Sequence, residues 1–300
     1  VELCLNNAYS GVYDKRILTA KRLKANALWD ANYPMSVKNT MVDLAMLRND
    51  AICYLDTNIR SSFSDTELAQ MIKDYSVFNN YLVDKNIHHY YTRETTSKKR
   101  VPVTITYFLS IQYASHVLNY GAHIPFVKDY CQLSGHIKDS LYPTVEDYEN
   151  DLKETLVTNR FNYFETLDDN VYQRATQNTS QANTSDLLEE SNVTTLFTMK
   201  RIVEADIQRE LYDFTDSDTR SRFKETEKAK FANWSSREVQ SFDIRFEMNA
   251  WEEERSIIHC YIDVTFRGLQ KRGILEVDIN KRTNNSSSAA ASLSSLTIFE

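Results

Sequence analysis

Glycine is scarce in this sequence. Five glycines occur among 300 residues, roughly a quarter of the usual share of about 7%. Nucleotide- and phosphate-binding loops need clustered glycines, because these let backbone amides approach the anion closely. The one spacing typical of such a loop, Gly268 to Gly273, continues with Ile274 and Leu275 where a lysine and a hydroxyl residue would follow. The sequence therefore excludes a glycine-rich nucleotide site.

Paired cysteines, excess basic charge and long apolar runs are also missing. The cysteines stand singly, which is typical of a reducing compartment and not of a disulfide framework: Cys4, Cys53, Cys131 and Cys260. The net charge of −7 offers no electrostatic gain on nucleic acid, so we expect no nucleic-acid partner. No apolar stretch approaches the roughly 18 residues of a membrane span, so we expect no membrane-embedded part.

Strand-like and helix-like segments alternate in the first 185 residues. Two apolar runs, 27–30 and 51–55, are each followed by a turn, and an amphipathic helix is predicted between them. Ser64 and Glu67 form a capping box ahead of a second helix. Strand–helix–strand order with short connections predicts an α/β layer with parallel strands. We therefore assign residues 1–185 to an α/β domain.

Residues 186–282 are predicted to form an α+β domain. The polar stretch 173–185 before them is typical of a loop or domain junction. An amphipathic helix and a charged helix precede three segments of alternating apolar and polar residues, which predict an antiparallel sheet with one buried face backed by the helices. The apolar positions of these segments include Ile244, Phe246, Ile262, Val264, Val277 and Ile279.

Residues 283–300 are predicted to form a flexible arm. Asn, Ser and Ala dominate residues 284–295, a composition typical of a linker. The linker is followed by a β-prone apolar tip, Leu296, Thr297, Ile298 and Phe299. A tethered strand of this kind is either an unused end or adds itself to the sheet edge of another molecule. The residues alone leave both interpretations open.

Asp30 and Asp56 are the best candidates for chemistry. Each closes a predicted parallel strand, where α/β enzymes place catalytic groups, and two carboxylates can hold a metal or act as an acid/base pair. A metal-dependent hydrolase is therefore one hypothesis. Aspartate also suits strand-ending turns, and no lysine or histidine lies nearby in the sequence to complete a site. We favour the structural interpretation and expect no enzymatic activity, no catalytic residues and no cofactor.

A metal site built on histidine has weaker support. His116, His123 and His136 are too widely spaced for a helical zinc motif, and a composite site with Cys131 is the one alternative left open. We expect no metal.

The order of elements in the last hundred residues resembles the C-terminal domain of contractile-tail sheath proteins of bacteriophages and related injection machines. The likeness is carried by a helix at 195–212, the segment 214–217, a second helix, the strand segments 241–246, 258–266 and 274–279, and a short terminal arm. The first half is compatible with the preceding sheath domain. Sheath proteins usually have a longer N-terminal portion with its own arm, so by this resemblance the 1–185 domain is N-terminally incomplete.

The resemblance implies a mechanical role in a virion tail. Sheath subunits assemble in the host cytoplasm as stacked, hexameric rings around an inner tail tube, and they meet a baseplate and a tail terminator. Their contraction drives the tube through the host envelope, with energy from rearranged subunit contacts and no cofactor. By this resemblance, the tip Leu296–Phe299 is donated to a neighbour's sheet. The strand-accepting positions are then Ile244, Phe246, Ile262, Val264, Val277 and Ile279. The alternative is a baseplate or other virion protein that shares the C-terminal module.

Overall fold

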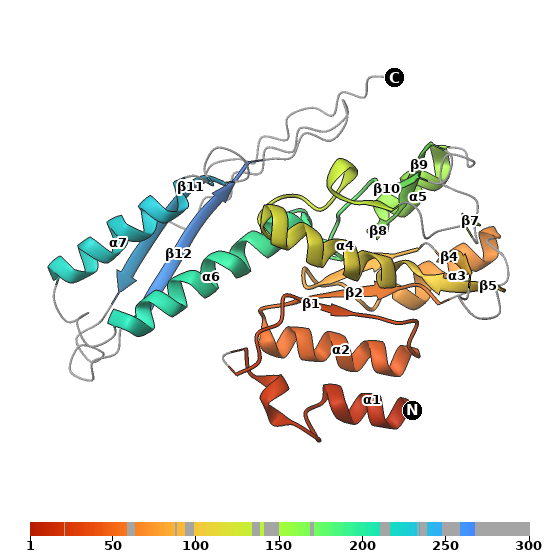
Figure 1. Cartoon of the computed structure of the whole chain (residues 1–300), viewed down its shortest axis with the longest axis horizontal. Coiled ribbons are helices and arrows are strands. Elements are labelled where there is room, and N and C mark those ends of the chain that lie inside the picture. Colours follow the sequence, from red (N-terminus) through yellow and green to blue (C-terminus); the bar gives the residue numbers. More distant parts are fainter. Residues whose placement is uncertain are drawn as a thin grey trace. The chain divides into compact units, whose positions relative to one another are not determined.

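The structure is a computed structural model (Figure 1). It describes residues 1–20, 22–58, 64–87, 89–93, 99–133, 139–140, 150–168, 171–210, 217–232, 234, 239–247 and 259–267. The chain divides into two compact units, Val1–Phe197 and Thr198–Glu300. In the described part, no helix is long and apolar enough to cross a bilayer.

A parallel sheet forms the centre of the first unit. Its strands lie in the order β1-β2-β3-β8, and all neighbours are parallel. They are β1 (Ala27–Trp29), β2 (Ile52–Asp56), β3 (Val83–Asn86) and β8 (Phe161–Asn162). Helices supply the crossovers: α2 (Met35–Arg48), α3 (Asp65–Tyr75) and, before β8, α5 (Asn150–Thr158). The predicted α/β layer with parallel strands is confirmed.

The two faces of this sheet carry different helices. On one face α2 packs on β2, and α1 (Glu2–Tyr9) packs on the outside of α2. On the other face α4 (Ile105–Tyr120) packs on β1 and β2 (Figure 1). Trp29 joins the two apolar cores, because its ring stacks on Tyr54 at 4.2 Å and meets Tyr113 of α4 edge-on at 5.6 Å.

Two small antiparallel sheets complete the first unit. One has the order β5-β4-β7, with β4 (His89–Arg93), β5 (Arg100–Thr104) and β7 (Asp139–Ser140). The other has the order β6-β10-β9, with β6 (Gln132–Leu133), β9 (Phe164–Asp168) and β10 (Val171–Arg174). Short 3₁₀ helices connect elements at η1 (Lys15–Leu18), η2 (Lys128–Tyr130) and η4 (Asp186–Leu188).

The polar stretch 173–185 is a packed connection inside the first unit. After β10, residues 177–180 are buried although all four are polar. The backbone amide of Ser180 donates to the carbonyl oxygen of Val83 at 2.7 Å, and that of Asn178 donates to Oδ1 of Asn162 at 2.7 Å. Buried polar groups are tolerated here because hydrogen bonds satisfy them. Composition alone suggested an exposed loop or a junction.

Helix α6 (Glu190–Glu210) begins in the first unit and continues into the second. The second unit then contains α7 (Ser217–Phe231), β11 (Val239–Glu247) and β12 (His259–Phe266). The two strands are antiparallel, and α7 packs on β11 through two aromatic pairs, Phe223 with Phe246 and Phe231 with Phe242. The predicted α+β class, with antiparallel strands backed by a helix, is confirmed. The predicted strand at 274–279 and the arm at 283–300 lie outside the described residues.

Candidate functional site

Asp30 and Asp56 lie together at one edge of the parallel sheet, as their positions after β1 and β2 predict. Oδ2 of Asp30 bonds the ammonium of Lys38 and accepts the backbone amide of Asp56 at 3.0 Å. Lys38 also donates to the carbonyl oxygen of Asp56 at 2.8 Å. The Asp56 carboxylate accepts the hydroxyl of Thr106 and its backbone amide, the latter at 3.3 Å. Protein donors therefore engage both carboxylates.

Burial decides what this cluster can do. Asp30, Lys38 and Asp56 are 2%, 0% and 0% exposed. Loss of solvation, together with the neighbouring charge of Asp30, raises the pKa of Asp56. Substrate has no access to carboxylates that are sealed in this way. The geometry favours the structural interpretation, in which the cluster joins the ends of β1 and β2 to α2 and α4.

Lys38 is a residue that the sequence analysis missed, and the statement that no lysine lies nearby to complete a cluster was wrong. The signal is present, because Lys38 lies three and four residues before Met41 and Val42, which are buried on the face of α2 that packs on the sheet. A lysine on an apolar helix face, close in sequence to a strand-ending aspartate, indicates a buried ion pair.

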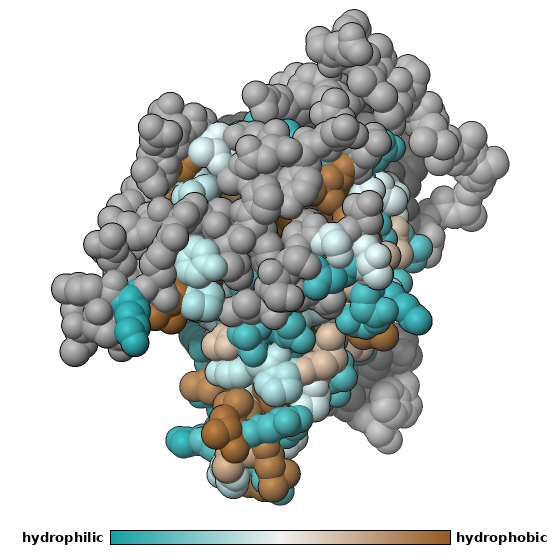
Figure 2. All heavy atoms as spheres, turned by 90° about the vertical axis from the view of Figure 1, so that its right-hand side faces the viewer, coloured by the Kyte–Doolittle hydropathy of each residue, from teal (hydrophilic) through white to brown (hydrophobic). Residues whose placement is uncertain are grey.

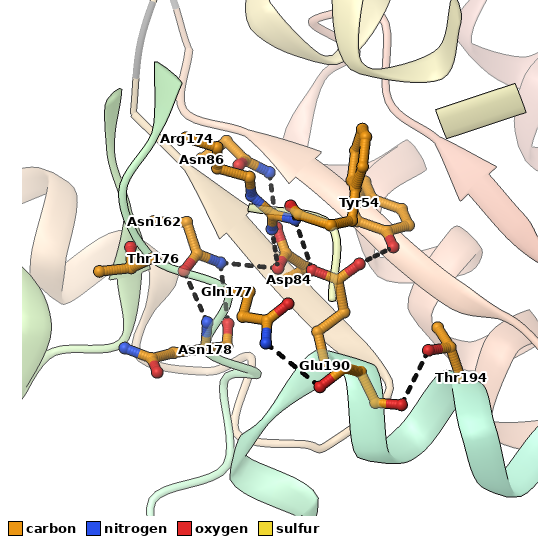
Figure 3. Close-up of polar contacts among 12 residues, drawn as sticks. Tyr54, Asp84, Asn86, Asn162, Arg174, Thr176, Gln177, Asn178, Glu190 and Thr194 are labelled. Carbon is orange, nitrogen blue, oxygen red and sulfur yellow. Dashed lines mark hydrogen bonds and ion pairs between the residues drawn. The ribbon is translucent and has the colours of Figure 1, made fainter. Parts of the chain in front are cut away.

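A second buried cluster is centred on Arg174 of β10 (Figure 3). Its guanidinium donates to Oδ2 of Asp84 on β3 at 2.7 Å and to Oε2 of Glu190 at the start of α6 at 2.6 Å. Glu190 also accepts the hydroxyl of Tyr54 from β2. Asp84 accepts the side-chain amide of Asn162 at 2.6 Å. One arginine thus ties two strands of the parallel sheet, a neighbouring sheet and the first turn of α6 together.

The electrostatics of the Arg174 cluster follow from its burial. Arg174 and Asp84 are 0% exposed and Glu190 is 1% exposed. Burial raises the pKa of Glu190 to about 7, against the opposing effect of the Arg174 charge, and burial raises the pKa of Asp84. None of these residues was singled out from the sequence. The sequence gives little signal for Asp84, because three of the four residues of β3 are polar and all four are nonetheless buried.

His116 and Cys131, two members of the composite metal site that the sequence left open, are buried in the first unit. Nε2 of His116 contacts the carbonyl oxygen of Ile124 at 2.9 Å, and burial lowers the pKa of His116. Cys131 is buried, and burial raises the pKa of its thiol to about 12. His136 lies outside the described residues. Among the residues that the structure describes, no group of three or more His, Cys, Asp or Glu side chains could hold a metal ion.

The predicted strand-accepting positions lie in the second unit. Ile244 of β11 is buried and stands opposite Ile262 of β12, while Phe246 stands opposite Cys260. Directly opposed residues share a face of the sheet, and Phe246 contacts α7 through Phe223, so this face is the one that α7 covers. Val277, Ile279 and the arm residues Leu296, Thr297, Ile298 and Phe299 lie outside the described residues.

A groove of about 390 Å³ runs between α7 and β11. It combines apolar side chains of β11 with cationic ones from both elements, and its lining is Ser217, Arg220, Ser221, Lys224, Ile244, Arg245, Phe246 and Glu247. Acidic neighbours neutralise part of this charge. Lys224 pairs with Asp243 at 2.9 Å, and Arg245 pairs with Asp263 and, at 2.6 Å, with Glu247. The groove includes two of the predicted strand-accepting residues.

Comparison with known proteins identifies relatives of this fold. No family model and no curated protein matches the sequence. Solved structures do match. A chain of the six-fold symmetrised baseplate of the anti-feeding prophage is 9% identical with a TM-score of 0.65, over 94% of this chain and 73% of that chain. A chain of the contracted sheath complex of the PVC extracellular contractile injection system is 10% identical with a TM-score of 0.66, over 88% and 72%.

A third match is the contracted helical sheath of the anti-feeding prophage, 10% identical with a TM-score of 0.62, over 87% of this chain and 70% of that chain. Three structures thus agree over most of the chain, and the likeness extends across both units. The resemblance that the order of elements predicted is confirmed at the level of the fold. The chain has the fold of sheath and baseplate chains of contractile injection systems.

Proposed function

We propose that this protein is a structural subunit of a contractile sheath, which polymerises around an inner tube and contracts to drive that tube through a host envelope. The observation that carries the proposal is the likeness to two contracted sheaths over 88% and 87% of the chain. The two buried clusters support it, because their ion pairs join elements of the fold and their own carboxylates are buried away from substrate. The protein then acts through subunit contacts and needs no cofactor or nucleotide.

Strand donation between copies is the linking device in this proposal. The tip Leu296–Phe299 of one copy adds to the sheet of a neighbour, beside β11 and the groove under α7. In the described residues this sheet has two long strands, and such a pair gains stability from a further strand, for which the apolar side chains of β11 offer pockets. The remaining partners in the proposal are an inner tail tube, a baseplate and a tail terminator, within a virion-like tail.

A deletion tests this function. A chain that ends at Arg282 should fold like the full chain, by circular dichroism and thermal unfolding, yet form no tubes in negative-stain electron microscopy. Ile298→Asp should have the same effect as the deletion, because it places a charge within the donated strand. Ser295→Asp, in the linker, is the matched control and should leave assembly intact. Normal tubes from the truncated chain would contradict the proposal.

The second candidate is a baseplate component, and one observation favours it. The match to the anti-feeding prophage baseplate chain covers 94% of this chain, a larger share than the 88% and 87% covered by the two sheath chains. The same images separate the two functions. Long tubes support a sheath subunit, while particles that never exceed one ring support a baseplate component.

A further inference from the structure

Helix α4 has an apolar outer face. Its 16 residues include no Asp, Glu, Lys or Arg. The inner face packs in the core through residues such as Phe108 and Leu109, yet apolar side chains also project outward. Tyr107, Ile111 and Leu118 are 57%, 56% and 86% exposed, and Ala114 between them is exposed as well. Helix α7 shows the contrast, because its exposed positions carry mostly charged and polar residues.

The spacing of these residues makes them one surface. Positions 107, 111, 114 and 118 follow one another at intervals of four, three and four, so they form a single stripe along the helix. At about 1.5 Å per residue the stripe is roughly 16 Å long. Single exposed apolar residues are ordinary on a protein surface, whereas a contiguous apolar patch marks an interaction site. We call this surface the α4 stripe.

A second apolar surface lies at the start of the chain. Leu3, Val12 and Tyr13 are exposed, and so is the thiol of Cys4. Leu3 and Cys4 lie in the first turn of α1, while Val12 and Tyr13 follow its last residue, where the backbone amide of Val12 donates to the carbonyl oxygen of Asn7 and closes the turn at the end of the helix. Figure 2 shows apolar side chains, with hydrophilic ones beside them, at the height that α1 has in Figure 1. We call this surface the N-terminal patch.

The two surfaces lie on opposite sides of the same unit. Helix α4 covers one face of the parallel sheet, while α1 packs on α2 on the other face (Figure 1). A contact that joins two different patches is heterologous, and its repetition generates a ring or a helix, whereas a two-fold dimer would use one patch twice. Two different patches on opposite sides of one compact unit therefore allow identical copies to stack head to tail.

We infer that the α4 stripe of one copy packs against the N-terminal patch of a second copy of this chain. The inference deepens the proposed function and rests on it for the identity of the partner. Charge supports that choice. Copies of a chain with a net charge of −7 repel one another, and they meet at least cost where a surface carries no charge. The uncharged α4 stripe provides such a surface, and burial of its side chains favours the contact.

Cross-linking tests this contact on the full chain. Cys4 already lies in the N-terminal patch, so Leu118→Cys places a partner thiol on the α4 stripe. A short bismaleimide, which does not require disulfide geometry, should then link copies into a ladder of dimers, trimers and longer products on a denaturing gel. Asn119→Cys is the matched control: it is exposed on the same helix but off the stripe, and it should give no such ladder.

A second substitution tests whether the contact joins two different patches. Adding Cys4→Ser to Leu118→Cys should remove the ladder, because a head-to-tail link needs both thiols. The inference is overturned if Leu118→Cys cross-links no better than Asn119→Cys, or if the ladder persists without Cys4.

Self-association gives an independent measurement. Leu118→Lys should weaken association about tenfold or more in sedimentation velocity, since it removes a buried leucine from the contact, while Asn119→Lys adds the same charge and should not. Tubes from Leu118→Lys that match the wild type would refute the inference and leave the proposed function intact. If Leu118→Cys gives the ladder while the wild-type chain forms neither rings nor tubes, the proposed function is refuted and the inference stands.

Discussion

Replacing Arg174 with methionine is the most informative perturbation of the first unit. Methionine is uncharged and has a similar volume, although its side chain is shorter, so the substitution removes the guanidinium and largely fills the space of the arginine stem. It leaves the carboxylates of Asp84 and Glu190 buried without the cation that each bonds, at 2.7 and 2.6 Å. Asp84 keeps amide donors from Asn86 and Asn162, so its loss is partly compensated.

The expected magnitude is large. Removing one partner of a buried ion pair costs about 3–5 kcal/mol, because the remaining charge stays desolvated. For a unit the size of Val1–Phe197, this corresponds to a fall in the midpoint of thermal unfolding of roughly 6–20 °C. Adding Glu190→Gln to Arg174→Met should recover part of the loss, since it removes one of the two unpaired charges. That non-additivity is the signature of a direct interaction.

Tryptophan fluorescence can report the first unit alone. The chain has three tryptophans, and only Trp29 belongs to the first unit. A Trp234→Phe, Trp251→Phe background leaves Trp29, whose ring stacks on Tyr54, itself bonded to Glu190. Arg16→Met is the control, because Arg16 pairs with Asp14 on the surface and should leave the midpoint unchanged. If Arg174→Met shifts the midpoint no more than Arg16→Met, the cluster does not hold the unit together.

Three further predictions concern the other buried groups. Lys38→Met should destabilise the first unit by about 3–5 kcal/mol in urea titrations, because it leaves Asp30 buried without its cation. Burial lowers the pKa of His89 to about 4, below its unfolded value of 6.5, so its neutral form stabilises the fold above pH 6.5 and this stability is lost as the pH falls. The wild type should therefore lose about 1 kcal/mol more than His89→Gln between pH 7 and pH 5.5. Elemental analysis should find no stoichiometric divalent metal whose loss follows Asp30→Ala, and a metal that does would restore the hydrolase hypothesis.

Local patterns predicted the regular part of the fold. Apolar runs that end at Asp30 and Asp56 gave β1 and β2, and the Ser64–Glu67 capping box marked the start of α3, where both reciprocal bonds are present. Alternation of apolar and polar residues gave β11 and β12. These features depend on a few neighbouring residues, so one sequence contains the information that defines them.

Buried polar residues account for what the sequence did not reveal. Helix α6 was expected to start at residue 195, yet it starts at Glu190, because residues 190–195, all polar except Val193, are nonetheless buried. Gln177 donates to Ser191 at 3.1 Å, and Glu190 is held by Arg174. Such partners come from separate elements, here β10 with the connection that follows it and the first turn of α6, and they meet only when the unit folds, so spacing along the chain gives no signal for them.

The distribution of charge links these observations to function. A catalytic site requires reactive groups that substrate can reach, and here the most perturbed carboxylates, Asp56, Asp84 and Glu190, are sealed against Thr106 and Arg174. Their bonds join the sheet, α4 and the first turn of α6 within the first unit. The exposed face of α4 carries no charge at all. Under the proposed function, a compact unit with charge paired inside and an apolar stripe outside would transmit force through contacts with its neighbours.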